Sequence, residues 1–318
     1  MATQHRFPAD RGLTTRMVLT IFFIGLLYAV FVGALVAARV QLGIVIVICG
    51  GMLIAQLYFS DRIALFSMHG KLVTQQQAPQ LYGIISRLTS MANMPMPKVA
   101  VADSEMPNAF ATGRNQKNSV VCVTTGLLRR LNEPELEAVL AHELSHVAHR
   151  DVAVMTIASF LGIMAGMLTR VLMWSGLFGG FGMGGGGRGG NQNNNNNGAA
   201  QVMMAEMALM LFSAIVYAIS FLLIRTLSRY RELAADRAGA ILIGNPNMLA
   251  TALQKVCGDI GRIPTRDLRS AQYFNAFYFA PALANGVSVS SLFATHPSLE
   301  RRLDALAKLD AQMRQQLT

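Results

Sequence analysis

The chain has 318 residues, of which 53% are hydrophobic and 14% are charged, and its formal net charge is +10. A typical soluble domain contains about 25% charged residues, so the composition argues against an ordinary soluble protein. It favours a membrane protein with several spans, whose basic surfaces face anionic lipid or the cytosol. Nucleic-acid binding is the competing interpretation of the positive charge. The basic residues are scattered, however, and no recognition motif accompanies them.

The three cysteines are distributed singly along the chain and form no C-x-x-C pair. We therefore expect a reducing compartment, no disulfide framework, and cysteines that serve as small apolar packing residues.

A polar tail, residues 1–16, precedes two uncharged runs, 17–38 and 40–60, which only Arg39 separates. A helix of about 20 apolar residues crosses a bilayer core, so the two runs predict a transmembrane hairpin. A cleaved signal peptide is the alternative for the first run. That run is longer than the usual apolar core of a signal peptide, and a second run follows at once, so a retained anchor is favoured.

Two further spans are expected at about 152–175 and 203–224. Residues 176–200 between them consist mostly of glycine and asparagine. Such a segment cannot bury a core, so it predicts a flexible low-complexity loop.

Lysine and arginine counts predict the orientation of these four spans. Basic residues flank the outer ends of the first and fourth spans, whereas the Gly/Asn loop carries one: Arg6, Arg11, Arg16, Arg225, Arg229 and Arg231 against Arg188. Both termini are then cytosolic. The polar blocks 61–151 and 225–318 share that side and can form one domain.

These polar blocks predict an α+β domain with a small β-sheet. Helical patterns cover 78–91, "SRYRELAADRAGAILIGN" and "NPNMLATALQKVCGDI". The segment "FATHPSLERRLDALAKLDAQM" contains the last helix, with Thr295 as its expected N-cap. Strands are expected at 98–102 and 119–124, with "ATGRNQKN" between them as a turn that can have strand flanks. Another helix begins at Asn132, which forms a capping-box pattern with Glu135.

That helix carries "HELSH", an H-E-x-x-H motif at His142, Glu143 and His146. Residues i and i+4 lie on one face of a helix, so the two imidazoles can bind one Zn²⁺. Glu143 lies beside them and can act as general base on water whose pKa the zinc lowers. A polar helix that carries these residues by chance is the alternative. The motif is rare enough to favour one catalytic zinc per chain.

A catalytic zinc site needs a third protein ligand. If the motif helix runs unbroken into the third span, His146 lies about 9 Å above the membrane, since a helix rises 1.5 Å per residue. If the fourth span continues into "RYRELAAD", Glu232 lies about 12 Å above the same face. The similar heights favour Glu232 as the third ligand over a simple ion pair with an arginine such as Arg229.

Three other residues have less direct assignments. Asp236 shares a helix face with Glu232, so it can accept a hydrogen bond from the free N–H of a ligand histidine. A solvated charge on the helix surface is the alternative. His149 stands where the metzincin pattern has glycine, so a role near the ligands or at the membrane interface is expected rather than ligation. Asp151 can orient His149, cap backbone, or mark the membrane interface.

Four segments, "HELSHVAHRD", "RYRELAADRAG", "NAFATG" and "THPSLERRL", together resemble the HtpX-type membrane zinc metalloproteases, which are related to the CAAX prenyl proteases. The resemblance extends over nearly the whole chain. It implies four transmembrane helices and a cytosolic zincin-like (gluzincin) domain in a bacterial cytoplasmic membrane, with Glu232 as third ligand. It also implies cleavage of misfolded membrane proteins, and of unfolded soluble proteins, in membrane quality control.

The resemblance further implies an edge strand at "NAF" that pairs with the substrate backbone. Asn108 and His296 match residues that hold substrate or the tetrahedral oxyanion, a role that suits donors aimed at developing charge. A turn residue and a helix-start residue are the alternatives.

Competing functions are a CAAX-type processing protease, an intramembrane protease, and a non-proteolytic metal transporter or scaffold. Four spans are few for an enclosed chamber, and the motif helix starts with glutamates outside the bilayer. The four runs lack the charges that transport favours, and a scaffold does not need Glu143. The oligomeric state is open.

Overall fold

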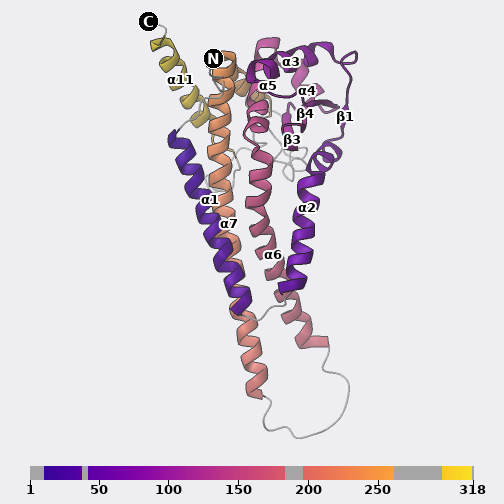
Figure 1. The fold of residues 1–318 in the computed structure, drawn as a ribbon, viewed down its shortest axis with the longest axis vertical. Helices are drawn as coiled ribbons and strands as arrows, with labels where there is room; N and C mark the ends of the chain where they lie inside the picture. The colour runs from indigo at the N-terminus through magenta and orange to yellow at the C-terminus, as the bar shows by residue number, and fades with distance from the viewer. Residues whose placement is uncertain (1–10, 38–41, 183–195, 261–295, 317–318) are drawn as a thin grey trace. The chain divides into compact units, whose positions relative to one another are not determined.

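A computed structural model describes residues 11–37, 42–182, 196–260 and 296–316 (Figure 1). The elements in chain order are α1 Arg11–Ala37, α2 Leu42–Ser67, β1 Gly70–Leu72, α3 Pro79–Ala92, β2 Lys98–Ala102, β3 Ala109–Asn115, β4 Asn118–Thr124, α4 Thr125–Arg130, α5 Glu133–Ala148, α6 Asp151–Gly182, α7 Asn196–Ile243, α8 Pro246–Ile260 and α11 Leu299–Gln315. The first ten residues of the predicted tail and Thr295 lie outside the described residues.

The chain divides into two compact units. One unit contains the β-sheet with α3, α4, α5, α8, α11 and the sheet-side ends of the long helices. The other contains most of α1, the first part of α2, nearly all of α6 and the first part of α7. The polar blocks 61–151 and 225–318 fall in the first unit, which also contains residues 54–60 of the second apolar run.

Within the described residues, three helices are long and apolar enough to cross a membrane: Thr14–Ala37, Ala153–Arg170 and Met207–Ile243. The second predicted span falls on α2, some of whose side chains lie outside the described set. The Gly/Asn loop is shorter than predicted, because α6 extends to Gly182 and α7 begins at Asn196. Segment 183–195 lies outside the described residues.

The helices of the apolar unit pack through a small core. Phe31 of α1 stacks on Phe212 of α7 with ring centroids 6.3 Å apart, and Ala165 of α6 is fully buried beside them. A Cβ at Gly166 would lie 3.1 Å from the Tyr217 ring. This glycine therefore allows α6 and α7 to approach closely.

The sheet has four strands in the order β1-β2-β4-β3. The predicted strands 98–102 and 119–124 are confirmed as β2 and β4, which pair in parallel. The segment "ATGRNQKN" contains the expected turn at residues 116–117 with a strand on each side, because β3 runs antiparallel to β4 as far as Asn115 and β4 begins at Asn118. Strand β1, which the pattern did not indicate, pairs antiparallel with β2. Among the strands of the described residues, β3 forms the edge of the sheet on the side opposite β1.

Helix α5 lies at the centre of the main core and begins as its sequence predicts. The Asn132 side chain accepts from the Glu135 backbone N–H, and the Glu135 side chain accepts from the Asn132 backbone N–H. Apolar residues of α5 such as Leu140 and Leu144 are fully buried with residues of α3, the sheet and α8. Since its polar motif lies on a core helix, the motif side chains are buried as well.

The expectation that the motif helix runs unbroken into the third span is wrong. Helix α5 ends at Ala148, and α6 starts anew at Asp151. Arg150 between them adopts φ 55°, the left-handed region that non-glycine residues seldom occupy. The Gln116 side chain, from the β3–β4 turn, donates to the Ala148 carbonyl over 3.0 Å. The junction is therefore a defined turn.

Helix α7 is continuous from Asn196 to Ile243, as the ligand argument requires (Figure 1). It ends at Gly244, whose φ of 69° suits a C-terminal glycine. The last helix is capped by Ser298, which accepts from the Arg301 N–H, instead of by Thr295. The residue before a proline avoids helical backbone, so His296 lies outside the helix and the cap falls after Pro297.

Candidate metal centre and active site

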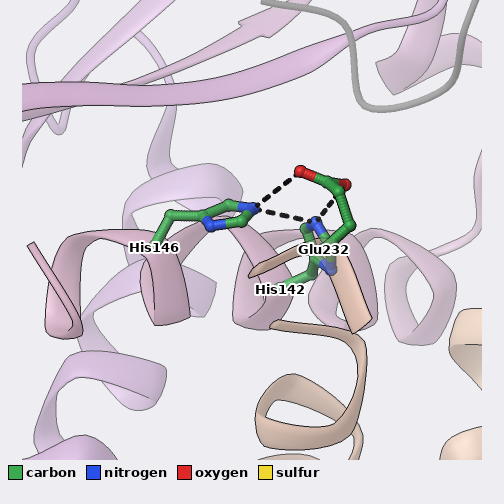
Figure 2. A group of neighbouring side chains, drawn as sticks. All are labelled: His142, His146 and Glu232. Carbon is green, nitrogen blue, oxygen red and sulfur yellow. Dashed lines mark hydrogen bonds and ion pairs between the residues drawn. The ribbon is translucent and has the colours of Figure 1, made fainter. Parts of the chain in front are cut away.

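The structure brings His142, His146 and Glu232 together from two helices (Figure 2). The histidines lie one turn apart on α5, with their rings nearly perpendicular at 87°. Their Nε2 atoms are 3.2 Å apart. The Glu232 carboxylate on α7 lies 3.6 Å from Nε2 of His142 and 3.5 Å from Nε2 of His146. Each of the three residues therefore offers a ligand atom within 4.8 Å of the other two.

The donor set fits a tetrahedral metal ion. Zinc with nitrogen and oxygen ligands at about 2.0–2.2 Å would place neighbouring ligand atoms about 3.3 Å apart, which is close to the spacing seen here. Each histidine also directs its Nδ1 at a carboxylate, so a neutral ring donates from Nδ1 and has a lone pair on Nε2. The Nε2 lone pairs of the two histidines and the negative Glu232 carboxylate would all be stabilised by a cation bound between them. The residues present therefore suit a metal with two imidazoles and one carboxylate as ligands.

Glu143 is buried beside this cluster and is held by the edge strand. The Ala111 backbone N–H of β3 donates to its Oε2 over 2.9 Å. Burial raises the pKa of Glu143 above its ordinary value, and the neighbouring His142 and His146 oppose that shift. A carboxyl group whose pKa is raised in this way is a better proton acceptor than an exposed one.

His142 is oriented by Asp236, whose Oδ1 lies 2.9 Å from its Nδ1. Asp236 is in turn bound by Arg302 of α11 through two contacts, 2.8 Å from Nε and 2.6 Å from a terminal nitrogen. Burial acts to lower the pKa of His142, but the hydrogen bonds to Asp236 and Glu232 outweigh it and raise that pKa to about 9. The Asp236 contact matches the sequence expectation. Arg302 was missed, because one arginine in a charged helix carries no signal for burial.

His146 is oriented by Asp151, whose Oδ2 lies 2.6 Å from its Nδ1. The same oxygen is 2.9 Å from Arg231. Burial acts to raise the pKa of Asp151, but the charge of Arg231 and the contact with His146 outweigh it and lower that pKa to about 2. The sequence analysis gives Asp151 three alternatives, which are to orient His149, to cap backbone or to mark the membrane interface. The histidine that it contacts is His146 and not His149.

Close packing of α7 against α5 depends on Gly239. A Cβ at this position would lie 2.7 Å from the backbone nitrogen of His142. Gly239 follows Glu232 by seven residues and Asp236 by three, so all three share one face of α7. This spacing is visible in the sequence and could have identified the glycine as part of the site.

The remaining predicted residues are placed differently. His296 Nδ1 lies 3.0 Å from Glu232, so the ring adjoins the cluster. Asn108 is fully buried just before β3, and its backbone N–H donates to Thr124 Oγ1 over 2.8 Å. His149 lies exposed at the C-cap of α5, where its Nδ1 is 2.8 Å from the Ser145 carbonyl oxygen, instead of in the cluster.

Comparison with protein families matches residues 75–310 to the family described as "Peptidase family M48". This match covers well over half of the chain and includes every residue of the cluster. The chain belongs to peptidase family M48. The H-E-x-x-H motif on α5 and Glu232 on α7 both fall within the matched region, so the cluster is the candidate active centre of this M48 peptidase.

Two similar relatives extend the M48 assignment to the apolar segments. "Protease HtpX homolog 1" of Streptomyces coelicolor is 56% identical over 98% of this chain and 97% of its own length. "Protease HtpX homolog" of Moorella thermoacetica is 48% identical over 98% of each chain. The resemblance to the HtpX-type proteases is therefore confirmed. The protein is a membrane metalloprotease.

A solved structure shares the fold of this M48 peptidase. The crystal structure of S. mikatae Ste24p superposes with a TM-score of 0.53 at 18% identity, and the match covers 93% of this chain and 67% of the other. At this identity the likeness concerns the fold. The mainly helical architecture with a small mixed sheet is thus one already seen in a solved protein.

Proposed function

We propose that the protein is a zinc endopeptidase of a bacterial cytoplasmic membrane that cleaves misfolded membrane proteins and unfolded soluble segments. His142, His146 and Glu232 are the zinc ligands and Glu143 is the general base. The single observation that carries the proposal is the clustering of the three ligand groups. The two histidine Nε2 atoms are 3.2 Å apart, and the two Glu232 oxygens lie 3.6 Å from that of His142 and 3.5 Å from that of His146. Zinc, when bound, supplies Lewis-acid polarisation of the peptide carbonyl and makes water more acidic.

Glu143 takes the proton of the attacking water and passes it to the leaving amine. The Ala111 N–H fixes one oxygen of this carboxylate, which leaves the other to contact the water. Because β3 is an edge strand, an extended substrate segment can add to it by backbone hydrogen bonds. Unfolded or partly extracted chains offer such segments, and folded proteins seldom do.

His296 and Asn108 are assigned to substrate or oxyanion contact. The position of His296 beside Glu232 supports a role at the reacting carbonyl, and Asn108 immediately precedes the edge strand. His149 is assigned a role at the membrane interface, and Asp236 positions His142.

Four spans, with 17–38, 40–60, about 152–175 and about 203–224 as their residues, give both termini and the catalytic domain a cytosolic location. This arrangement is supported by the basic residues at the outer ends of the first and fourth spans. The domain consists of residues 61–151 and 225–318.

The test uses the full chain purified in detergent. Glu143→Gln should lower cleavage of unfolded casein by at least about 10³-fold, since the proton acceptor is lost, and zinc content should stay at one per chain. Glu232→Ala should lose zinc, measured by elemental analysis. The matched control is Glu105→Ala, an exposed glutamate of the same domain, which should change neither. Casein cleavage that survives Glu143→Gln with zinc bound would overturn the general-base assignment, and full zinc in Glu232→Ala would overturn the ligand set.

A further inference from the structure

We propose that Asp151 is a positioning residue for the metal ligand His146, and that Arg231 holds Asp151 in place. This inference deepens the proposed function and rests on it, since it concerns the affinity of the same metal centre. It assigns a role to the turn between α5 and α6, which the motif itself does not explain.

The first observation is a buried three-residue chain. Asp151 Oδ2 lies 2.6 Å from His146 Nδ1 and 2.9 Å from the Arg231 guanidinium. Asp151 is 4% exposed and Arg231 is 8% exposed. A carboxylate that accepts from Nδ1–H fixes the tautomer and the rotation of the ring. Nε2 of His146 is then directed at Glu232, at 3.5 Å.

The second observation is that this contact requires the helix break. Successive residues of an α-helix are rotated by about 100°, so a residue five positions on lies about 140° around the axis. In an unbroken helix, Asp151 would thus face away from His146. The left-handed Arg150, with φ 55°, ends α5 and lets α6 begin at Asp151 with its carboxylate turned back to the ring.

The third observation concerns the helix that supplies Arg231. Arg231 and the third ligand Glu232 are consecutive residues of α7. One turn of α7 therefore supplies both a ligand and the cation that binds the orienting carboxylate. This chain of contacts joins residues from α5, α6 and α7 at the metal centre. Loss of the Asp151 carboxylate should therefore weaken metal binding.

The experiment measures zinc affinity by competition with a chromogenic chelator, on the full chain carrying Glu143→Gln to prevent autolysis. Asp151→Asn should weaken zinc binding by about 10–100-fold, the usual effect of removing such a partner. Arg231→Gln should weaken it by a smaller factor, because Asp151 remains. The matched control is Asp304→Asn, an exposed carboxylate paired with Lys308, which should bind zinc as the parent does. Cobalt substitution adds a second readout, since a reoriented His146 should change the visible absorption of bound Co²⁺.

A merely structural ion pair predicts a different result. Asp151→Asn would then lower the melting temperature of the chelator-treated protein and leave the zinc dissociation constant and the cobalt spectrum unchanged, which would overturn the inference. If Asp151→Asn does not fold, Arg231→Gln decides by the same two readouts. If the parent chain binds no zinc, the proposed ligand set fails instead. Zinc binding lost in His146→Ala but unchanged in Asp151→Asn overturns only the positioning role of Asp151.

Discussion

The two histidines of the candidate metal centre are each supported by an Arg–Asp pair, and the two pairs differ in origin. On the His142 side, Asp236 comes from α7 and receives two contacts from Arg302 of α11. On the His146 side, Asp151 comes from the α5–α6 turn and receives one contact from Arg231 of α7. Both Arg–Asp pairs join segments far apart in the sequence. The difference is that Asp236 lies on another helix, far along the chain from His142, whereas Asp151 follows His146 by five residues, across the local turn.

This difference indicates which parts of the chain the metal centre depends on. The His142 side depends on α11 as well as on α7, because Arg302 of α11 holds Asp236 in place. The His146 side needs only the α5–α6 turn and one residue of α7. Both sides nevertheless have the same chemistry, a buried arginine that stabilises a buried carboxylate, which in turn orients an imidazole. The comparison can be tested by removing the arginine on either side.

The largest effect is expected for Arg302→Met. Arg302 and Asp236 are almost completely buried, with side-chain exposures of 2% and 1%. Removing one partner of a buried ion pair leaves an uncompensated charge and costs about 3–5 kcal/mol. Arg231→Met should cost less, because its single contact is replaced more easily. Chemical denaturation of the chelator-treated protein measures both. An equal loss in the two variants would contradict the asymmetry between the sides.

A smaller loss of stability is expected for Gly239→Ala. The added Cβ would lie 2.7 Å from the His142 backbone nitrogen, and backbone cannot move aside as a flexible side chain can. Overpacking of this kind costs about 1–3 kcal/mol. The displacement of α7 should also lower zinc content, which elemental analysis measures.

The matched control for this variant is Gly258→Ala on α8. A Cβ added to Gly258 would meet no neighbouring segment within 4 Å, and alanine favours a helix over glycine by about 1 kcal/mol. The control should therefore keep its zinc and be at least as stable as the parent. Normal zinc content in Gly239→Ala would show that the close approach of α7 to α5 is not needed.

The sequence predicts most elements of the fold because their signals are local. Helices α3 and α8 begin and end near the expected residues, α7 ends near its expected residue, and the capping box of α5 is present as predicted. The errors occur where local signals are weak. No glycine or proline marks the left-handed Arg150, so the break between α5 and α6 is invisible in the sequence. Strand β1 has only three residues and exists through its pairing with β2.

The candidate site shows the same division. The H-E-x-x-H spacing identifies His142, Glu143 and His146, and helical periodicity relates Asp236 to Glu232. Both signals lie within single helices. Arg302 and Asp151, by contrast, enter the site through tertiary packing and through the turn at Arg150, which no periodicity encodes.

The last prediction concerns pH and separates the two sides once more. In protein freed of metal, the hydrogen bonds to Asp236 and Glu232 outweigh burial and raise the pKa of His142 to about 9 from 6.5. The contribution of this proton to the stability of the folded, metal-free protein is complete below pH 6.5 and is lost as the pH rises through 9. Zinc needs the nitrogen without its proton, so its apparent affinity should fall up to about tenfold for each pH unit below that pKa.

Chelator competition across the pH range between these two pKa values measures this slope, and a pH-indicator dye measures the proton released when zinc is added. Asp236→Asn removes one of the contacts that retain the proton on His142. The pH range in which zinc affinity changes steeply, here called the steep region, should therefore move to lower pH. Asp151→Asn alters a contact with the other histidine, so it should leave the steep region where it is while lowering affinity throughout. If both asparagine variants shifted the steep region equally, the two sides would be coupled more tightly than their separate contacts suggest.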